Sequence, residues 1–179
     1  LGLWFTVCID GIVPGLTFAA AMAVYDAVSD CSPAVKWPND VLIGGRKVCG
    51  ILAEHRSGLT ALGIGINIHH RPEDFPEELR GRAGSLESTT GKSFDRVAVL
   101  ARVLIALDQS VILLRAGGFE QLRARWAEAC GIVGKTIRRD GVTGVVLEID
   151  SEGALLLKTA SGIERFLSGD ITILGEGGD

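Results

Sequence analysis

The sequence lacks the features that mark nucleic-acid-coating, disordered or membrane-spanning proteins. Its 179 residues include 18 Lys and Arg against 22 Asp and Glu, so there is no excess of positive charge. Apolar residues make up 47% and charged residues 22%, which excludes disorder as the overall state. Charges at Asp10, Asp26, Arg102 and Asp108 interrupt every apolar run before the roughly 18 residues that a membrane span needs. The composition therefore predicts a globular chain with no membrane partner.

Motifs for metal or thiol chemistry are also missing. The four cysteines are Cys8, Cys31, Cys49 and Cys130. They form no CxxC pair and each lies among apolar residues, which predicts reduced core thiols in a cytoplasmic protein. The three histidines have no Cys or carboxylate at metal-ligand spacing, and the sequence contains no HExxH, Walker A or GxSxG motif.

The beginning of the chain has no initiator Met, no basic leader and no small-residue cleavage site. The first residues already have the pattern of a strand, so a secretory signal is not expected. These features predict a fragment whose true beginning lies upstream.

Apolar patterning divides the first part of the chain into a helix and several strands. An Ala-rich helix is predicted over residues 16–28, where nearly every helical face is apolar. Strands are predicted over residues 3–9, 35–37, 41–43, 48–54 and 59–68. Short turns separate the last four, which favours an antiparallel meander. The polar segment 69–90 is predicted to be a surface loop.

Two more helices precede a change in the residue pattern, from helical periodicity to short β segments. Helices are predicted over residues 94–114 and 119–129, and Gly117-Gly118 separates them. From Ile132 onward, short β segments alternate with turns about every ten residues, which is typical of a small all-β module. The predicted fold is α+β, with residues 1–131 and 132–179 as two domains.

The first candidate site is a hairpin that contains KWPND at residues 36–40 and GGRKVCGIL at residues 44–52. Two lysines, Lys36 and Lys47, bracket this hairpin. A lysine ammonium binds phosphate or a developing oxyanion, and Asn39 and Asp40 beside it would suit a nucleotide and its Mg²⁺. The alternative is an ordinary solvated turn with Lys47 pointing outward.

The second candidate site is GIGIN at residues 63–67. Alternate residues of a strand share a face, so Gly63 and Gly65 leave bare backbone on one side. A flat ligand or another backbone would fit there, with Asn67 at the rim. The alternative is a helix packed closely on the glycines. The spacing is not that of a dinucleotide-binding GxGxxG motif.

Together, KWPND, RKVCGIL and GIGIN resemble the catalytic domain of biotin protein ligases, in order and at similar separations. The likeness continues into residues 134–170, which resemble the family's small C-terminal barrel. The resemblance implies a class II synthetase-like domain with a mixed, mostly antiparallel sheet packed with helices, followed by an SH3-like β-barrel. It also implies a ligase that activates biotin with ATP and Mg²⁺ and transfers it to a lysine of a biotin carboxyl carrier domain.

The resemblance also implies a role for each matching residue. Lys47 would be catalytic and would contact the biotin carboxylate and the phosphoryl oxygens. The other residues expected to contact biotin are Gly50, Ile51, Leu52, Gly63 and Gly65. The residues expected to contact ATP are Lys36, Asn39, Asp40 and Asn67, and Asp40 and Asn67 would also hold Mg²⁺.

One family feature does not occur in these 179 residues, namely the GRGRxGR loop that closes over the ligands. We therefore expect the chain alone to have little activity. No helix-turn-helix is found either, so no DNA-binding role is predicted, and a homodimer is compatible with the resemblance. The alternatives are a relative of lipoate ligases, a fragment that only binds the carrier domain, or a folded remnant with neither activity.

Overall fold

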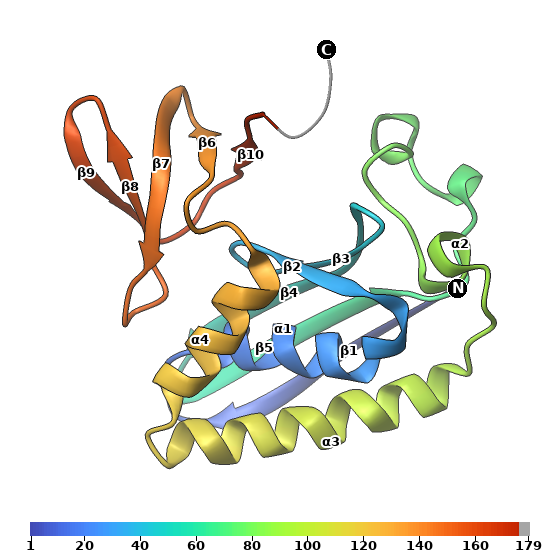
Figure 1. Ribbon diagram of the computed structural model, residues 1–179. Coiled ribbons are helices and arrows are strands. Elements are labelled where there is room, and N and C mark those ends of the chain that lie inside the picture. The colour runs from blue at the N-terminus through green and yellow to red at the C-terminus, as the bar shows by residue number, and fades with distance from the viewer. Residues whose placement is uncertain (176–179) are drawn as a thin grey trace.

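The computed structural model describes residues 1–175 as two antiparallel sheets and a layer of helices (Figure 1). The central sheet has five strands in the order β1-β5-β4-β3-β2. Its strands are β1 (Gly2–Asp10), β2 (Pro33–Lys36), β3 (Asp40–Ile43), β4 (Arg46–Arg56) and β5 (Leu59–Asn67). All four ladders between them are antiparallel, so the predicted meander is confirmed.

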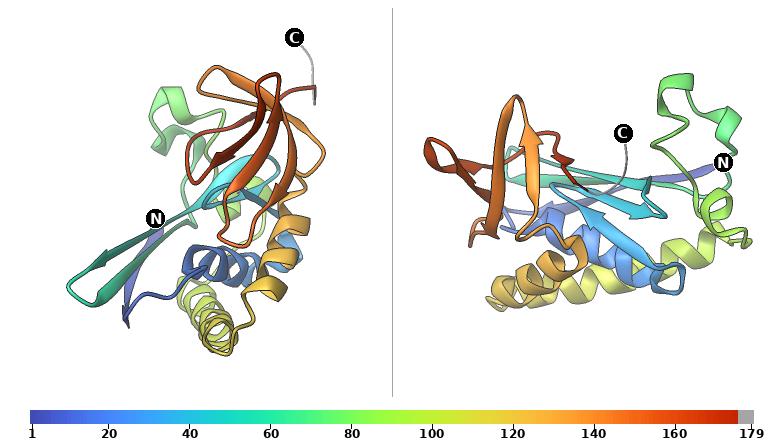
Figure 2. Two further views of the ribbon diagram at one scale, coloured as in Figure 1. Left: turned by 90° about the vertical axis from the view of Figure 1, so that its left-hand side faces the viewer. Right: turned by 45° about the horizontal axis from the view of Figure 1, so that its top comes forward.

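Helices cover one face of the central sheet (Figure 2). They are α1 (Leu16–Ala27), α3 (Arg96–Arg115) and α4 (Phe119–Cys130). Nine of the twelve residues of α1 are buried, because its small alanines let it lie between the sheet and α3. Gly131, in the left-handed conformation with φ 59°, ends α4. All three helices lie where the apolar periodicity predicts them.

Helix α3 combines a buried and an exposed apolar side. It is the one helix in the described residues that is long and apolar enough to cross a membrane by length and composition. Val99, Val103 and Leu107 are buried on its inner side. Ile105 and Ile112 on its outer side are each 61% exposed. Length, composition and burial of α3 do not test whether the protein contacts a membrane. The expected absence of a membrane partner therefore stays a prediction.

The segment after β5 is more ordered than a plain loop. It contains two 3-10 turns, η2 (Pro72–Asp74) and η3 (Glu77–Leu79), and a short helix, α2 (Leu86–Thr90). A third 3-10 turn, η1 (Ser29–Cys31), follows α1. Ser85 caps α2 by accepting a hydrogen bond from the backbone N–H of Ser88 at 3.0 Å. The prediction of a surface loop over residues 69–90 was therefore wrong at its end, where α2 forms and Ser85 and Leu86 are buried.

The C-terminal sheet also has five antiparallel strands. They are β6 (Thr136–Arg139), β7 (Val142–Ile149), β8 (Leu155–Thr159), β9 (Gly162–Phe166) and β10 (Thr172–Ile173). Their order is β10-β6-β7-β8-β9, and no ladder joins β9 to β10 in residues 1–175. The α+β class and the small β module are confirmed, but the described strands form an open sheet and not a closed barrel.

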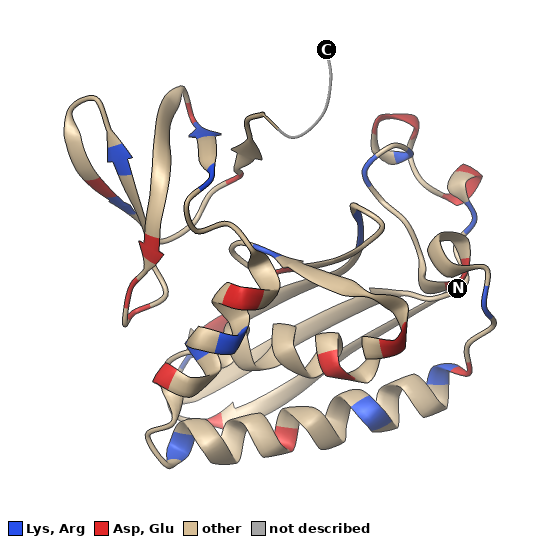
Figure 3. Cartoon of the chain, in the orientation of Figure 1, with Lys and Arg blue, Asp and Glu red and all other residues tan. Residues whose placement is uncertain are grey.

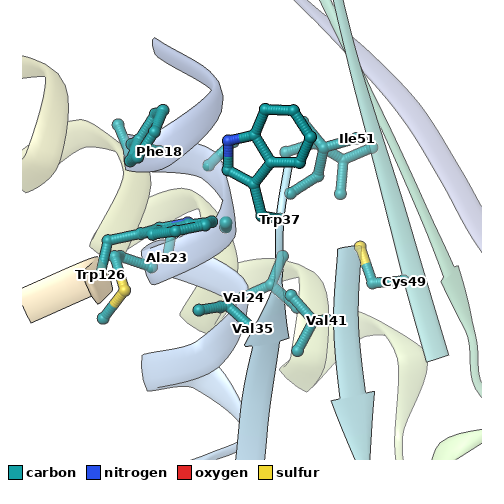
Figure 4. Packing of buried hydrophobic residues seen from close by; sticks show 14 of the residues in the cluster. Phe18, Ala23, Val24, Val35, Trp37, Val41, Cys49, Ile51 and Trp126 are labelled. Atoms are coloured by element: carbon teal, nitrogen blue, oxygen red, sulfur yellow. The ribbon is translucent and has the colours of Figure 1, made fainter. Parts of the chain in front are cut away.

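One hydrophobic core runs through both sheets. Trp37, in the turn that follows β2, is 1% exposed and lies between Phe18 of α1 and Ile51 of β4 (Figure 4). Its indole N–H donates a hydrogen bond of 3.3 Å to the carbonyl oxygen of Gly153, in the turn between β7 and β8. A Cβ on Gly153 would lie 2.7 Å from Phe18 Cε2, so only glycine lets this turn approach α1 so closely. The division at residue 131 stays a prediction, since these contacts tie the two parts together.

The cysteine prediction was wrong for Cys8. Cys31 and Cys49 are buried, but Cys8 is exposed. In β1 the inner residues Leu3, Phe5 and Val7 pack against the core, so the alternating Cys8 lies on the outer face.

Candidate active site

A pocket of about 530 Å³ lies on the central sheet. Its lining comes from β1, β4 and β5 together with Asn39. The lining residues are Trp4, Phe5, Thr6, Asn39, Lys47, Gly50, Ile51, Leu52, Gly63, Ile64 and Gly65. Seven of them belong to the predicted site: Asn39, Lys47, Gly50, Ile51, Leu52, Gly63 and Gly65.

Strand register places the two glycine motifs side by side. Gly65 pairs with Gly50 of β4 on one side and with Trp4 of β1 on the other. Gly50 in turn pairs with Asp40 of β3. Paired residues of neighbouring strands share a face, so this row carries two bare backbone positions between an indole and a carboxylate.

The glycines of β5 face away from α1. Leu62, Ile64 and Ile66 alternate with them and are buried in the core that α1 covers. A Cβ on Gly63 would have the carbonyl oxygen of Leu52, at 3.7 Å, as its one neighbour within 4 Å. A Cβ on Gly65 would lie 2.8 Å from Cδ1 of Trp4, because the indole covers this glycine. The alternative of a helix packed on the glycines is therefore wrong.

A β-bulge turns Lys47 toward the glycine face. The register passes from Val41 opposite Cys49 to Leu42 opposite Lys47, which leaves Val48 as an extra residue in β4. In a regular strand Lys47 and Gly50, three residues apart, would lie on opposite faces. The extra residue puts them on the same face and lets both Val48 and Cys49 be buried.

The Lys47 side chain lies over the bare backbone of Gly50. A Cβ on Gly50 would lie 3.2 Å from both Cε and Nζ of Lys47. Nζ lies 2.7 Å from Oδ1 of Asp40, whose side chain is 16% exposed, whereas that of Lys47 is 48% exposed. Lys47 is thus accessible to solvent, while its contact with Asp40 directs its side chain over Gly50. The alternative of a solvated turn lysine that points outward is therefore wrong. Figure 3 shows basic positions in blue at the tip of this β3–β4 hairpin.

Asn39 fixes the backbone of Ile51. Its Nδ2 donates a hydrogen bond of 2.5 Å to the carbonyl oxygen of Ile51, and the N–H of Ile51 donates to the carbonyl oxygen of Asn39 at 3.2 Å. This reciprocal pair joins the KWPND segment to the middle of β4. Asn39 therefore shapes the pocket wall through the strand that it holds.

Three of the predicted site residues, Lys36, Asp40 and Asn67, lie outside the residues that line the pocket. Lys36 ends β2 and pairs with Asp40 across the β2–β3 turn. Asn67 ends β5 on the same face as Gly65, and its Nδ2 donates a hydrogen bond of 3.0 Å to the carbonyl oxygen of Gly84. The structure brings Asp40 and Lys47 into contact, while Asn67 lies two strands away from Asp40.

Sequence reasoning missed the aromatic side of the pocket. Trp4, 65% exposed, makes an edge contact with His70 at 5.8 Å, and His70 stacks on Phe75 at 5.3 Å between ring centroids. Burial, helped by His69 and opposed by Asp74, lowers the pKa of His70 below 6.5. The available signal was the alternation of Trp4 and Thr6 with the inner residues of β1.

The titratable groups do not suggest a resident metal centre. In residues 1–175 no group of three or more His, Cys, Asp or Glu side chains is arranged to hold an ion. Burial raises the pKa of the Cys49 thiol beside Asp40, so this thiol is neutral. The charged group that lines the pocket is the ammonium of Lys47, and the carboxylate of Asp40 lies beside the pocket in contact with it.

Two family models match separate parts of the chain. The model of the biotin/lipoate A/B protein ligase family matches residues 9–70, and that of the biotin protein ligase C terminal domain matches residues 135–174. The first covers the α1 helix and most of the pocket strands, and the second covers the C-terminal sheet.

Solved structures have the same fold. The biotin protein ligase of Aquifex aeolicus has a TM-score of 0.86 at 28% identity, over 96% of this chain and 82% of that one. The same enzyme in complex with biotin and ATP has a TM-score of 0.81 at 28% identity, over 96% of this chain and 78% of that one.

Relatives with similar sequences are also named as ligases. The bifunctional ligase/repressor BirA of Bacillus subtilis is 33% identical over 189 aligned residues, which cover 96% of this chain but 58% of BirA. The chain thus spans less than two thirds of that relative. The biotin--[acetyl-CoA-carboxylase] ligase of Paracoccus denitrificans is 34% identical over 162 aligned residues, 82% of this chain and 68% of that protein. The chain belongs to the biotin protein ligase family.

Proposed function

We propose that this chain carries the catalytic core of an ATP-dependent biotin ligase. In the first step a carboxylate oxygen of biotin bonds to the α-phosphorus of ATP, and the bond to pyrophosphate breaks. In the second step the amine of an acceptor lysine attacks the acyl carbon, AMP leaves and the amine loses a proton. The complex of the Aquifex aeolicus ligase with biotin and ATP supports this choice of substrates.

The observation that carries the proposal is the ammonium of Lys47 above the bare backbone of Gly50. Two like charges about 4 Å apart repel by about 4 kcal/mol near a protein surface. A carboxylate and a phosphate cannot approach each other without a cation that offsets this repulsion. Lys47 supplies that cation at a fixed place, which stabilises the charge that develops as the two groups react.

The flat ring system of biotin would lie along the glycines. Gly63 and Gly65 on β5, and Gly50, Ile51 and Leu52 on β4, would form its floor and walls. The open space above Gly63 supports this assignment, because no side chain of the described residues fills it. Trp4 would close one side.

ATP would lie toward the KWPND segment, where Lys36, Asn39 and Asp40 are the proposed contacts. Magnesium typically binds one or two carboxylates and completes its shell with substrate phosphates and water. Asp40 is a carboxylate beside the pocket, so it fits an ion that arrives with ATP, although its Oδ1 already faces Lys47. An ion held in this way would neutralise phosphate charge.

The acceptor would be the biotin carrier domain of a carboxylase, as the name of the Paracoccus denitrificans relative suggests. A homodimer and a cytoplasmic location remain predictions.

Biotin-dependent exchange between ATP and labelled pyrophosphate tests the proposal, with lipoate as the competing substrate. In a longer form of the protein we expect exchange with biotin and not with lipoate, and transfer of biotin to a purified carrier domain. Exchange with lipoate alone would make the chain a lipoate-type ligase. Carrier binding without exchange, either with this chain or with a longer form of the protein, would reduce the function to a binding role.

A further inference from the structure

The segment 82–84 lies against the backbone of Lys47 as a short extra strand. The N–H of Lys47 donates to the carbonyl oxygen of Arg82 at 2.8 Å, and the N–H of Gly84 donates to the carbonyl oxygen of Lys47 at 3.0 Å. The result is a parallel bridge between Lys47 and Ala83, outside the two regular sheets. Both backbone polar groups of the proposed catalytic lysine are therefore held by this segment.

Asn67 holds the same segment from β5. Its Nδ2 donates to the carbonyl oxygen of Gly84 at 3.0 Å. A Cβ on Gly84 would lie 2.7 Å from Cγ2 of Thr89 and 3.1 Å from Cβ of Arg46, so Gly84 fits closely between α2 and the β3–β4 hairpin. Asn67 and the tight fit at Gly84 together fix where the segment meets Lys47.

The position of Lys47 depends on this support. The tip of the β3–β4 hairpin is exposed, and the bulge at Val48 interrupts its ladder to β3. A free hairpin end would let the ammonium of a long side chain move away from Gly50. The contacts of the 82–84 segment hold the backbone of Lys47 from the side opposite β3.

We propose that Asn67 is a positioning residue, which holds the 82–84 segment against the backbone of Lys47 and so keeps its ammonium over Gly50. This proposal rests on the proposed ligase function. It differs from the expectation that Asn67 is a ligand of Mg²⁺ or a contact of ATP, because the amide group acts here on the chain itself.

Two substitutions separate positioning from ligation. Asn67→Asp keeps an oxygen that binds Mg²⁺ but loses the N–H that reaches Gly84. Gly84→Ala leaves Asn67 intact and pushes the segment away from Arg46 and Thr89. Gly81→Ala is the matched control, since a Cβ there has no atom within 4 Å and the glycine has no positive φ.

The first measurement is hydrogen exchange at the backbone amides of Lys47 and Gly84, by NMR on the intact chain. We expect exchange to be at least about tenfold faster in Asn67→Asp and Gly84→Ala, and unchanged in Gly81→Ala. This readout does not need activity. If the wild type lacked pyrophosphate exchange both as this chain and in a longer form of the protein, the ligase function would fail while the amide data still reported on the contact.

The second measurement is the rate of pyrophosphate exchange at saturating ATP and biotin, with Mg²⁺ varied. Positioning predicts that both variants lose at least about tenfold in kcat, while the Mg²⁺ concentration for half-maximal rate changes by less than about twofold. A loss in Asn67→Asp that appears only in the KM for ATP or in the Mg²⁺ requirement would overturn the proposal. So would a wild-type kcat in Gly84→Ala, or unchanged protection of the Lys47 amide in Asn67→Asp.

Discussion

Nζ of Lys47 lies 2.7 Å from Oδ1 of Asp40, across a ladder whose register shifts between the two residues. The ion pair is asymmetric, because the carboxylate is 16% exposed and the ammonium 48%. Asp40 therefore directs a lysine that still has access to the solvent and to the pocket. The half-exposed ammonium adds little to stability, which leaves its effect on charge in the pocket as its main consequence.

Replacing Lys47 by alanine in the complete protein should abolish adenylate formation. We expect biotin-dependent pyrophosphate exchange to fall by roughly 100-fold or more, the cost typical of a lost charge-stabilising group. Lys92→Ala is the control, since Lys92 also pairs with an aspartate, Asp30, at 3.6 Å. A loss of less than about tenfold, or about 1.4 kcal/mol of barrier, would show that Lys47 is not catalytic.

A methyl group on Gly63 should weaken biotin binding and leave stability unchanged. The space above this glycine is open, so Gly63→Ala would meet a ligand and not the core. Calorimetric titration with biotin and a thermal melt measure the two effects. Ala61→Val, an exposed position on the same face two residues earlier, should alter neither. A large fall in Tm at unchanged affinity would place the methyl group in packed protein.

The contribution of the Trp37 hydrogen bond to stability can be measured by comparison with a second buried tryptophan. Trp37 and Trp126 are both buried, but Nε1 of Trp126 has no hydrogen-bond partner in the described part of the chain. Trp37→Phe leaves the carbonyl oxygen of Gly153 unsatisfied, so it should cost about 1–3 kcal/mol more than Trp126→Phe in the free energy of unfolding. Urea denaturation measures both values. Equal losses would mean that the bond to Gly153 contributes nothing.

Stability should fall on acidification through His70. Because burial lowers the pKa of His70 in the folded chain, the unfolded chain takes up a proton first as the pH falls below 6.5. The free energy of unfolding then decreases until the folded-state pKa is passed. His70→Phe keeps an aromatic ring against Phe75 and should reduce this decrease between pH 7.5 and 5.5 in urea denaturation. Above pH 7.5 the difference in the free energy of unfolding between the wild type and His70→Phe should be constant. If the free energy of unfolding of His70→Phe fell with pH as steeply as that of the wild type, His70 would not be the titrating group.

Much of the fold was predictable because long elements leave a periodic signal. The alternation of Leu62, Ile64 and Ile66 with glycines predicted β5 to within a residue of Leu59–Asn67. Helix α2 was missed because its five residues make little more than one turn, too few for a period to be visible. Its buried cap, Ser85, is a polar residue whose burial depends on contacts from distant segments.

The residues of the site were likewise predictable where their signal is local in the sequence, and not where it depends on distant segments. Lys47, Gly63 and Gly65 were found from residue type and local spacing, whereas Gly50 was found from the resemblance to biotin protein ligases. Trp4 was not, because its place over Gly65 depends on pairing between strands some 60 residues apart in the chain. The bulge was also missed, although two consecutive buried residues, Val48 and Cys49, were its local sign.

The bulge at Val48 makes the length of β4 as important as its composition. Deleting Val48 would change the side-chain parity of the strand between Lys47 and Gly50, and the lysine would turn toward the core side of the sheet. A second inserted residue would have the same effect. This strand should therefore tolerate many substitutions during evolution but not the insertion or deletion of one residue. Gene libraries that vary β4 should keep its number of residues constant.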